Sequence, residues 1–303
     1  RSVIAEVART YVQLRGTQYR LAVARNNTRN QEETFGLTRA LLEGGRGTDL
    51  DIARAEAQLE TTRASTGSLE AAEIEAINRL AVLAGGRPDE FRWLLESAAG
   101  LPRPPELLAI TDPAGMLRRR PDVRSAERQL AAATARTGAA IADYFPRIEL
   151  TGSAGWRGTS LSDIGNSAAE RYSFGPRITW AALDLGRVRT QVKINNAHTE
   201  AALATWEKSV LTALEEADSA LNRYSRSLES AGRLRVAAEA SSKAAELARL
   251  RYRNGADSFL TVLDAERRLL EAEDLQASAE TDASLAAVAV YKAMGGGWEA
   301  FAR

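Results

Sequence analysis

An internal repeat constrains this 303-residue chain more than any other feature of its sequence. Residues 37–86 align without gaps on residues 247–296, at an offset of 210. Glycines match at both breaks of the repeat: Gly45 with Gly255, and Gly85 and Gly86 with Gly295 and Gly296. Shared composition of two alanine-rich helices explains the alanine and glutamate matches, but not glycines in register at two separate breaks. The repeat therefore predicts two copies of one structural unit.

Each copy has the pattern of a helix, a sharp turn and a second helix. Glycines at the turns can adopt positive φ where a helix ends, and Thr48 or Asp49 can cap the next helix. The turn before Ser258 offers the same chemistry. Between the turns, apolar residues step by three and four: Leu203, Trp206, Val210, Leu214, Ala217, Leu221, Tyr224, Leu228 and Ala231. Their spacing averages close to 3.5 and predicts left-handed coiled helices.

The expected helices differ in length. An unbroken pattern from about Gly186 to Arg253 predicts a rod on the order of 100 Å, because each helical residue adds about 1.5 Å. The return helix, about Ser258 to Met294, is half as long, and a helix from about Asp122 to Asp143 has the missing length. We therefore expect the two shorter helices to stack end to end along the long one, since an unpaired half would expose apolar surface. The Pro- and Gly-rich chain at 85–121 is expected to be irregular, with Phe91, Trp93, Leu94 and Leu95 packed inside it.

Two segments change to a period of two. In Pro146 to Trp156 one face carries Ile148, Leu150, Gly152, Ala154 and Trp156; in the second segment one face carries Tyr172, Phe174, Pro176, Ile178 and Trp180. Such alternation over about ten residues, with aromatic residues near the ends, is typical of a membrane β-barrel strand. A half-buried hairpin on an ordinary sheet has the same pattern, so periodicity leaves both interpretations open. Two strands cannot close a barrel, and other chains or further residues would have to supply the rest.

Several segments of the chain resemble a known family. They are 117–127, 139–152, the turn at 251–255 with 260–266, and the passage from strand to helix at 180–187. These segments are similar to those of bacterial outer-membrane efflux proteins, the TolC-like outer-membrane factors, and in particular to the NodT branch. The resemblance covers essentially the whole chain.

The resemblance implies a homotrimer in the outer membrane of a Gram-negative bacterium. Each protomer would give four strands to a shared twelve-stranded barrel, with a twelve-helix tunnel below it in the periplasm. The resemblance further implies a passive exit duct with no cofactor, working with a periplasmic adaptor and an inner-membrane transporter of the RND class. A complete member has a further strand pair, its leading helix and usually a lipidated N-terminal cysteine. Because residues 1–7 read as the middle of a helix, we expect this chain to lack that front end.

The expected fold class is mainly α: long antiparallel coiled hairpins, with one strand pair contributing to a membrane barrel. We predict a first periplasmic hairpin, an irregular mid-height segment, an upper half-helix, the outer-membrane strand pair, a second hairpin and a C-terminal segment. Their ranges are 1–84, 85–121, 122–144, 145–185, 186–294 and 295–303.

Three groups of site residues follow from the resemblance. The first group matches family positions that close the periplasmic mouth: Asp51, Asp264 and Tyr252. Asp51 lies six residues after Gly45, and Asp264 lies nine residues after Gly255. Both aspartates could instead be ordinary carboxylates in the first turns of a helix. The family's arginine next to the tyrosine is replaced by Asp257, so its hydrogen bonds must differ, and Arg251, Arg253 or Arg54 are candidates to substitute. The tips predicted to dock the adaptor carry Gly45, Thr48, Leu50, Gly255, Ser258 and Leu260, and the aromatic residues predicted at the membrane interface are Trp156, Tyr172, Phe174 and Trp180.

The amino-acid composition argues against nucleic-acid binding, thiolate metal sites and enzymatic activity. Forty basic residues balance forty acidic ones, whereas nucleic-acid binding normally needs a basic excess. The chain has no cysteine and one histidine, His198, in a polar helical stretch, so neither a thiolate metal site nor a nucleophile with a histidine base is expected, and the chain is predicted not to be an enzyme. A periplasmic adaptor and a coiled-coil scaffold are the alternatives, but the first carries one hairpin and the second leaves the aromatic strands unexplained. The sequence does not indicate the transported substrate.

Overall fold

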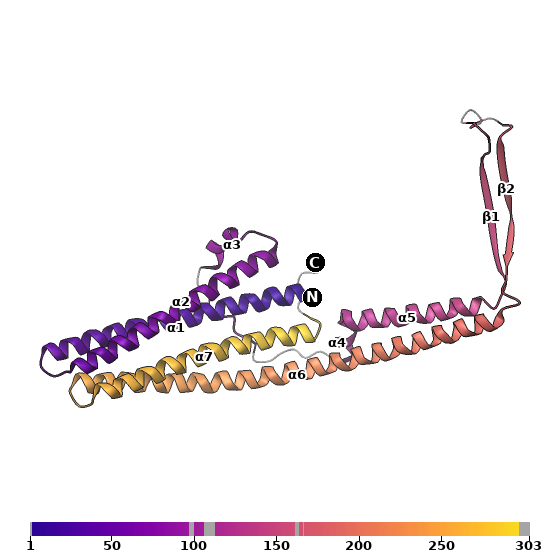
Figure 1. Cartoon of the computed structure of the whole chain (residues 1–303). Helices are drawn as coiled ribbons and strands as arrows, with labels where there is room; N and C mark the ends of the chain where they lie inside the picture. Colours follow the sequence, from indigo (N-terminus) through magenta and orange to yellow (C-terminus); the bar gives the residue numbers. More distant parts are fainter. Residues whose placement is uncertain (1, 97–99, 106–112, 161–163, 166, 297–303) are drawn as a thin grey trace. The chain divides into compact units, whose positions relative to one another are not determined.

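The chain was studied in a computed structural model that describes residues 2–96, 100–105, 113–160, 164–165 and 167–296 (Figure 1). It is mainly helical and holds one two-stranded antiparallel sheet, which confirms the predicted fold class. The chain divides into two compact units, Arg1–Arg119 with Leu214–Arg303, and Arg120–Ala213. Of the predicted C-terminal segment at 295–303, only Gly295 and Gly296 lie within the described residues.

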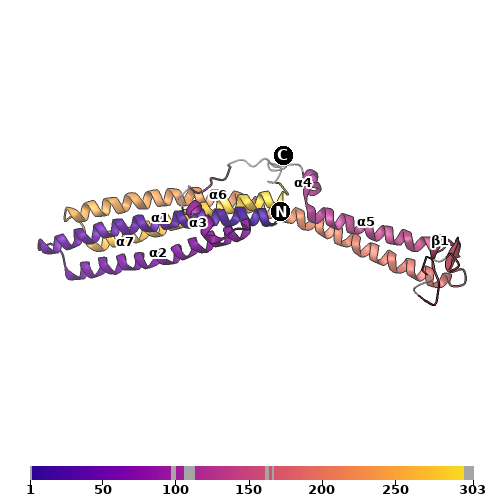
Figure 2. The same ribbon diagram turned by 90° about the horizontal axis from the view of Figure 1, so that it is seen from above.

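The first unit is built from two helical hairpins. Helices α1 (Ser2–Glu43) and α2 (Asp49–Ala84) form one, and the later part of α6 (Leu185–Arg253) with α7 (Phe259–Ala293) forms the other. Both views show the helices of each hairpin running side by side, and α1 also lies along α7 (Figures 1 and 2). The 69 residues of α6 continue without a break, as the sequence pattern predicted.

Small residues fill the seam of the second hairpin. Along this part of α6 the buried positions are three, four, seven or fourteen residues apart, and they are Ala217, Tyr224, Ala238, Ala245, Ala248 and Tyr252. Tyr224 packs against Ala286, Ala287 and Val290 of α7. Alanine has the highest helix propensity, and its short side chain lets two helices approach closely. Heptad spacing of small apolar residues thus explains the paired rods.

The buried face of α1 is unusually polar. Thr10, Gln18, Asn27, Gln31, Thr34 and Thr38 are all buried. Several of these side chains bond to neighbouring helices: Asn27 donates to Glu273 at 2.6 Å and Thr34 to Glu266 at 2.6 Å. The guanidinium of Arg20 also reaches both carboxylate oxygens of Asp274, at 2.7 and 3.0 Å. Hydrogen bonds therefore set much of the register between α1 and α7.

The segment expected to be irregular contains two short helices, α3 (Pro88–Leu95) and α4 (Pro113–Arg119). Proline in the first turn and the bond from the Arg87 amide to the Glu90 carboxylate explain why α3 forms. Leu95 is buried and Phe91 packs partly against the core. Trp93 is 73% exposed, so the expectation that it packs inside is wrong; the side chain of Leu94 lies outside the described residues.

The second unit contains α5 (Pro121–Ala142), the first part of α6, and strands β1 (Arg147–Trp156) and β2 (Glu170–Thr179). Helix α5 runs beside α6 in both views, and the hydroxyls of Thr137 and Thr199 lie 3.0 Å apart across them (Figures 1 and 2). Within the described residues, no helix has both the length and the hydropathy needed to cross a membrane.

Candidate functional sites at the hairpin tips and on the strand pair

The two hairpin tips share one backbone motif. After α1, the Gly45 amide donates to Leu42 O and the Arg46 amide to Leu41 O, both at 2.8 Å. After α6, the Gly255 amide donates to Tyr252 O and the Ala256 amide to Arg251 O, both at 2.9 Å. These paired bonds form a Schellman motif, which needs a left-handed residue, and the φ angles of the two glycines are 71° and 72°. The glycines that mark the repeat in the sequence therefore have the same structural role in both tips.

Asp51 belongs to the cap of α2. Thr48 is the N-cap residue, and its hydroxyl accepts from the Asp51 amide at 3.2 Å and donates to the Asp51 carboxylate at 2.8 Å. The Thr48 hydroxyl is thus the N-cap acceptor, and its bond to the Asp51 carboxylate holds that side chain in the first turn of α2. Thr48, rather than Asp49, is thus the cap. Leu50, between Thr48 and Asp51, is an apolar residue at the tip whose side chain is 56% exposed.

The second tip is capped differently. Ser258 occupies the N-cap position, but its side chain makes no capping hydrogen bond. Asp257 supplies the acceptor, because its Oδ1 accepts from the Ser258 amide at 2.9 Å and from the Thr261 hydroxyl at 2.8 Å. The Thr261 bond is the largest cause that lowers the pKa of Asp257. Arg251 pairs with this carboxylate at 3.2 Å, so Arg251, one of the three candidates, partners Asp257 itself.

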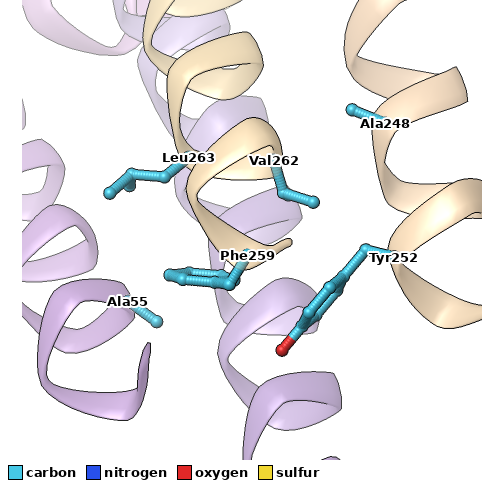
Figure 3. Packing of buried hydrophobic residues seen from close by; sticks show 6 residues of the cluster. All are labelled: Ala55, Ala248, Tyr252, Phe259, Val262 and Leu263. Atoms are coloured by element: carbon cyan, nitrogen blue, oxygen red, sulfur yellow. The ribbon is translucent and has the colours of Figure 1, made fainter. Parts of the chain in front are cut away.

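Tyr252 lies in the apolar core just behind the tips. Its ring comes from α6 and meets the Phe259 ring at the start of α7, with centroids 5.6 Å apart and the planes tilted by 56° (Figure 3). Ala55, Ala248, Val262 and Leu263 complete the cluster. Burial raises the pKa of the Tyr252 hydroxyl; the Thr38 hydroxyl offsets this in part, and the Asp51 charge adds to it. No hydrogen bond joins Tyr252 to Asp51 among the described residues.

Asp264 is a surface residue within this protomer. It is paired with Arg268 one turn along α7 at 2.9 Å, and both side chains are well exposed. Leu260, in the first turn of the same helix, is 55% exposed and matches Leu50 of the other tip.

Sequence reasoning missed a buried carboxylate near the tips. Glu266 is 4% exposed, and its Oε1 accepts from Arg249 of α6 at 2.8 Å and from Thr34 of α1 at 2.6 Å. It therefore joins three helices from both hairpins. The repeat alone could not have identified Glu266, because its counterpart in the first copy, Glu56, is exposed. Only the packing of the second copy distinguishes the two.

The strand pair presents two different faces. The register places Ile148 opposite Ile178, Leu150 opposite Pro176, Gly152 opposite Phe174 and Ala154 opposite Tyr172, so the apolar sets of both strands share one face. The other face pairs Glu149 with Arg177 and Ser153 with Ser173, whose hydroxyls lie 2.9 Å apart. Alternation predicted both faces correctly.

The apolar face is open to its surroundings in this chain. Ile148, Leu150 and Ile178 are about 70% exposed. The aromatic residues of the group are also exposed, from 53% for Trp180 and 55% for Trp156 to 77% for Phe174 and 83% for Tyr172. Trp180 follows β2, and its indole N–H donates to Tyr144 O at 3.0 Å. An apolar strand face of this kind needs an apolar environment to cover it.

The described residues hold no cluster of His, Asp and Glu able to bind a metal ion. His198, the only histidine, is exposed on α6.

Comparison with known proteins places these features in a family. The profile of the family described as outer membrane efflux protein matches residues 1–86 and 114–296. The chain is 32% identical over 298 residues to outer membrane protein OprJ of Pseudomonas aeruginosa, and 30% identical over 300 residues to nodulation protein T of Rhizobium leguminosarum. These matches cover 98% and 99% of the chain, but the chain spans only 62% of the length of each relative.

Solved structures agree with these matches. The structure of the outer-membrane channel OprN superposes with a TM-score of 0.88 at 47% identity, covering 98% of this chain and 66% of that one. A membrane protein from Pseudomonas aeruginosa matches with a TM-score of 0.84 at 32% identity, over 97% of this chain and 68% of the other.

Proposed function

The chain belongs to the outer membrane efflux protein family, and from that premise we propose that it is part of the exit duct of an efflux pump. One observation carries the proposal: a strand pair with an exposed apolar face occurs in the same chain as two helical hairpins with equivalent tips. A membrane would supply the apolar environment that the strand pair needs. The paired helices of the hairpins would form the wall of the duct.

The proposed assembly is a homotrimer in the outer membrane that extends into the periplasm. Three protomers, each giving four strands as the resemblance implies, would form one closed barrel to which this strand pair contributes, and closure leaves no unpaired strand edge. The apolar face would then contact lipid, with Trp156, Tyr172, Phe174 and Trp180 near its borders. The polar face, with Ser153, Ser173 and the Glu149–Arg177 pair, would line the interior.

The tips are proposed to meet a periplasmic adaptor that links the duct to an inner-membrane transporter of the RND class. Leu50 and Leu260 support this proposal, because each is an exposed leucine beside a glycine turn with the same backbone geometry. Gly45, Thr48, Gly255 and Ser258 shape those turns. The duct would conduct its substrates passively, and no reaction is assigned to it.

Asp51, Tyr252 and Asp264 are proposed to act at the periplasmic mouth. Threefold symmetry would gather three copies of each carboxylate, and a ring of carboxylates favours cations. Asp264 is exposed on α7, where it pairs with Arg268, and this exposure supports a place for it facing a lumen.

Single-channel conductance of the protein in planar bilayers tests the proposal. Asp51→Asn removes the charge, whereas Thr48→Ala disrupts the cap of α2 and keeps that charge. Reduced cation preference in Asp51→Asn but not in Thr48→Ala is expected. Unchanged conductance and cation preference in both Asp51→Asn and Tyr252→Phe would refute the role at the mouth. A protein that stays water-soluble without detergent and forms no channels would refute the duct itself.

A further inference from the structure

The repeat matches each helix of the first hairpin to one of the second. At its offset of 210, α1 corresponds to the later part of α6, and α2 corresponds to α7. Helices α1 and α6 both run unbroken into their glycine turns, so the offset applies along their length within the first unit. The two hairpins meet through α1 and α7, a contact that we call the internal interface. Its equivalent would join α6 to α2, but Figure 2 shows these two as the outer helices of the first unit, with α1 and α7 between them.

The face of α6 that corresponds to the internal interface is exposed. On α1, three residues spaced by seven bond to carboxylates of α7: Arg20, Asn27 and Thr34. Their counterparts on α6 are all small and exposed: Ser230, Ala237 and Ala244. Residues seven apart lie on one face of a coiled helix, so α6 presents an uncovered stripe where α1 binds its neighbour.

The matching face of α2 is exposed as well. Four residues of α7 are buried although their counterparts on α2 are exposed. The buried residues are Leu263, Glu266, Ala277 and Ser284. Their exposed counterparts, which lie on one face of α2 at a period of 3.5, are Ala53, Glu56, Gly67 and Ile74. Both outer helices therefore lack a neighbour that their counterparts have.

We propose that α6 of one copy packs antiparallel against α2 of the next copy, in the register that joins α1 to α7. Two hairpins that meet by one edge each keep one free edge each, and these free edges are the equivalents of the two that already meet. A second copy of the chain therefore fits both uncovered faces, in a head-to-tail contact that can close into a ring. The inference rests on the proposed function, because it assigns the surfaces that join the copies of the proposed homotrimer.

The register makes this interface between copies less polar than the internal one. In the internal interface, the Thr34 hydroxyl donates to the Glu266 carboxylate at 2.6 Å. The counterparts are Ala244 and Glu56, which keep the acceptor but lack the donor. The other two bonded pairs become Ser230 with Ala64 and Ala237 with Arg63. Packing of small side chains, rather than these hydrogen bonds, would hold the copies together along the helices.

The closest approach within the internal interface gives a distance for the new one. An ideal Cβ on Gly16 lies 3.0 Å from the Cβ of Thr281. The counterparts of these two residues are Arg226 and Ala71. Arg226 has a Cβ where Gly16 has none, so the two helices must lie slightly farther apart there. That spacing suits a disulfide, whose two Cβ atoms are about 3.5–4.5 Å apart.

Cysteine cross-linking tests the contact, because the 303 residues contain no cysteine of their own. Ala71→Cys combined with Arg226→Cys, in the full-length protein oxidised in detergent, should give covalently linked dimers and trimers on a denaturing gel. Ala64→Cys combined with Arg226→Cys is the matched control. Ala64 lies on the same face of α2 but seven residues away, about 10 Å along the helix, which is too far for a disulfide. Each single-cysteine variant should run as a monomer.

A second experiment tests the register through the missing hydrogen bond. Ala244→Thr restores the donor opposite Glu56 of the next copy, whereas Ala244→Val has the same shape without a hydroxyl. Exchange of copies between differently labelled trimers in detergent should be about twofold to tenfold slower for Ala244→Thr than for Ala244→Val, the range that one hydrogen bond per interface supplies. Adding Glu56→Ala to both variants should abolish the difference, because it removes the acceptor.

The outcomes separate this inference from the proposed function. Equal cross-linking of the predicted and control pairs, or no covalent product from the predicted pair in a trimer that forms channels, would overturn the contact alone. Equal exchange rates of the Ala244→Thr and Ala244→Val trimers would overturn the register. A protein that stays monomeric and forms no channels would overturn the proposed function instead.

Discussion

Arg249 of α6 and Glu266 of α7 form the most buried salt bridge among the described residues, with Nε and Oε1 2.8 Å apart and the carboxylate 5% exposed. The same oxygen accepts from Thr34 of α1, so one carboxylate connects both hairpins. A buried carboxylate with two donors is costly to disturb, because removing it leaves those donors without their acceptor.

Glu266→Ala should therefore lower the free energy of unfolding by about 2 kcal/mol, less than for a fully buried pair because Arg249 is 26% exposed. Denaturant unfolding followed by circular dichroism measures the change. Glu56→Ala is the matched control, since Glu56 is the repeat counterpart and is exposed; it should cost less than about 0.5 kcal/mol. Equal effects of the two substitutions would contradict the structural distinction between the copies.

Gly16 marks a close approach of α1 to α7. A Cβ added there would lie 2.4 Å from both Cγ2 and Oγ1 of Thr281, a side chain held by its bond to Ala277 O. Gly16→Ala should destabilise the protein by about 1–3 kcal/mol through overpacking, despite alanine's helix propensity. Gly36→Ala on the same helix meets nothing within 4 Å and should stabilise by about 0.5–1 kcal/mol. Thr281→Ala should recover part of the loss, and a Gly16→Ala protein as stable as Gly36→Ala would refute the close contact.

The lipid-facing role of the apolar strand face gives a third prediction. Leu150→Arg places a charge on that face away from its aromatic borders and should cost about 2–4 kcal/mol near the centre of the bilayer. Thr151→Arg, one residue away on the polar face, should insert normally. Folding into liposomes, followed by protection from protease, compares the two. Equal insertion of both variants would argue against lipid contact at Leu150.

Asp122, in the first turn of α5, gives a prediction on pH. The hydrogen bond from Arg120 is the largest cause that lowers its pKa below the ordinary value of 3.8. A lowered pKa in the folded state adds stability above the unfolded-state value, and this is lost as the pH falls through the folded value. Stability below about pH 4 should therefore fall less steeply in Asp122→Asn than in the unsubstituted protein. Parallel pH profiles in unfolding experiments would contradict this prediction.

How much the sequence predicts depends on how local the determining interaction is. Gly45 and Gly255 were recognisable because a helix end with positive φ depends on a few adjacent residues. The strand faces were recognisable because alternation with a period of two defines them along the chain.

Interactions between distant residues were not accessible in this way. Glu266 is buried and Glu56 exposed because of what packs against each helix, although the two match in the repeat. Helix α3 was not predicted, because the proline-rich composition of the segment obscured a local helix start. The exposure of Trp93 was not predicted either. At the second tip, Asp257 replaced Ser258 as the source of the capping acceptor, a choice between adjacent polar residues that side-chain geometry decides.

Matched glycine turns also set a length. Gly45 and Gly85 bound one return helix and Gly255 and Gly295 bound the other, so both pairs are separated by 40 residues (85 − 45 and 295 − 255). The return helices α2 and α7 accordingly have 36 and 35 residues. A one-residue deletion in either would turn every later side chain by about 100° around the helix and shorten that arm alone. Insertions or deletions that preserve the packing should thus come as whole heptads and in both hairpins together, so the repeat keeps the two hairpins equal in length.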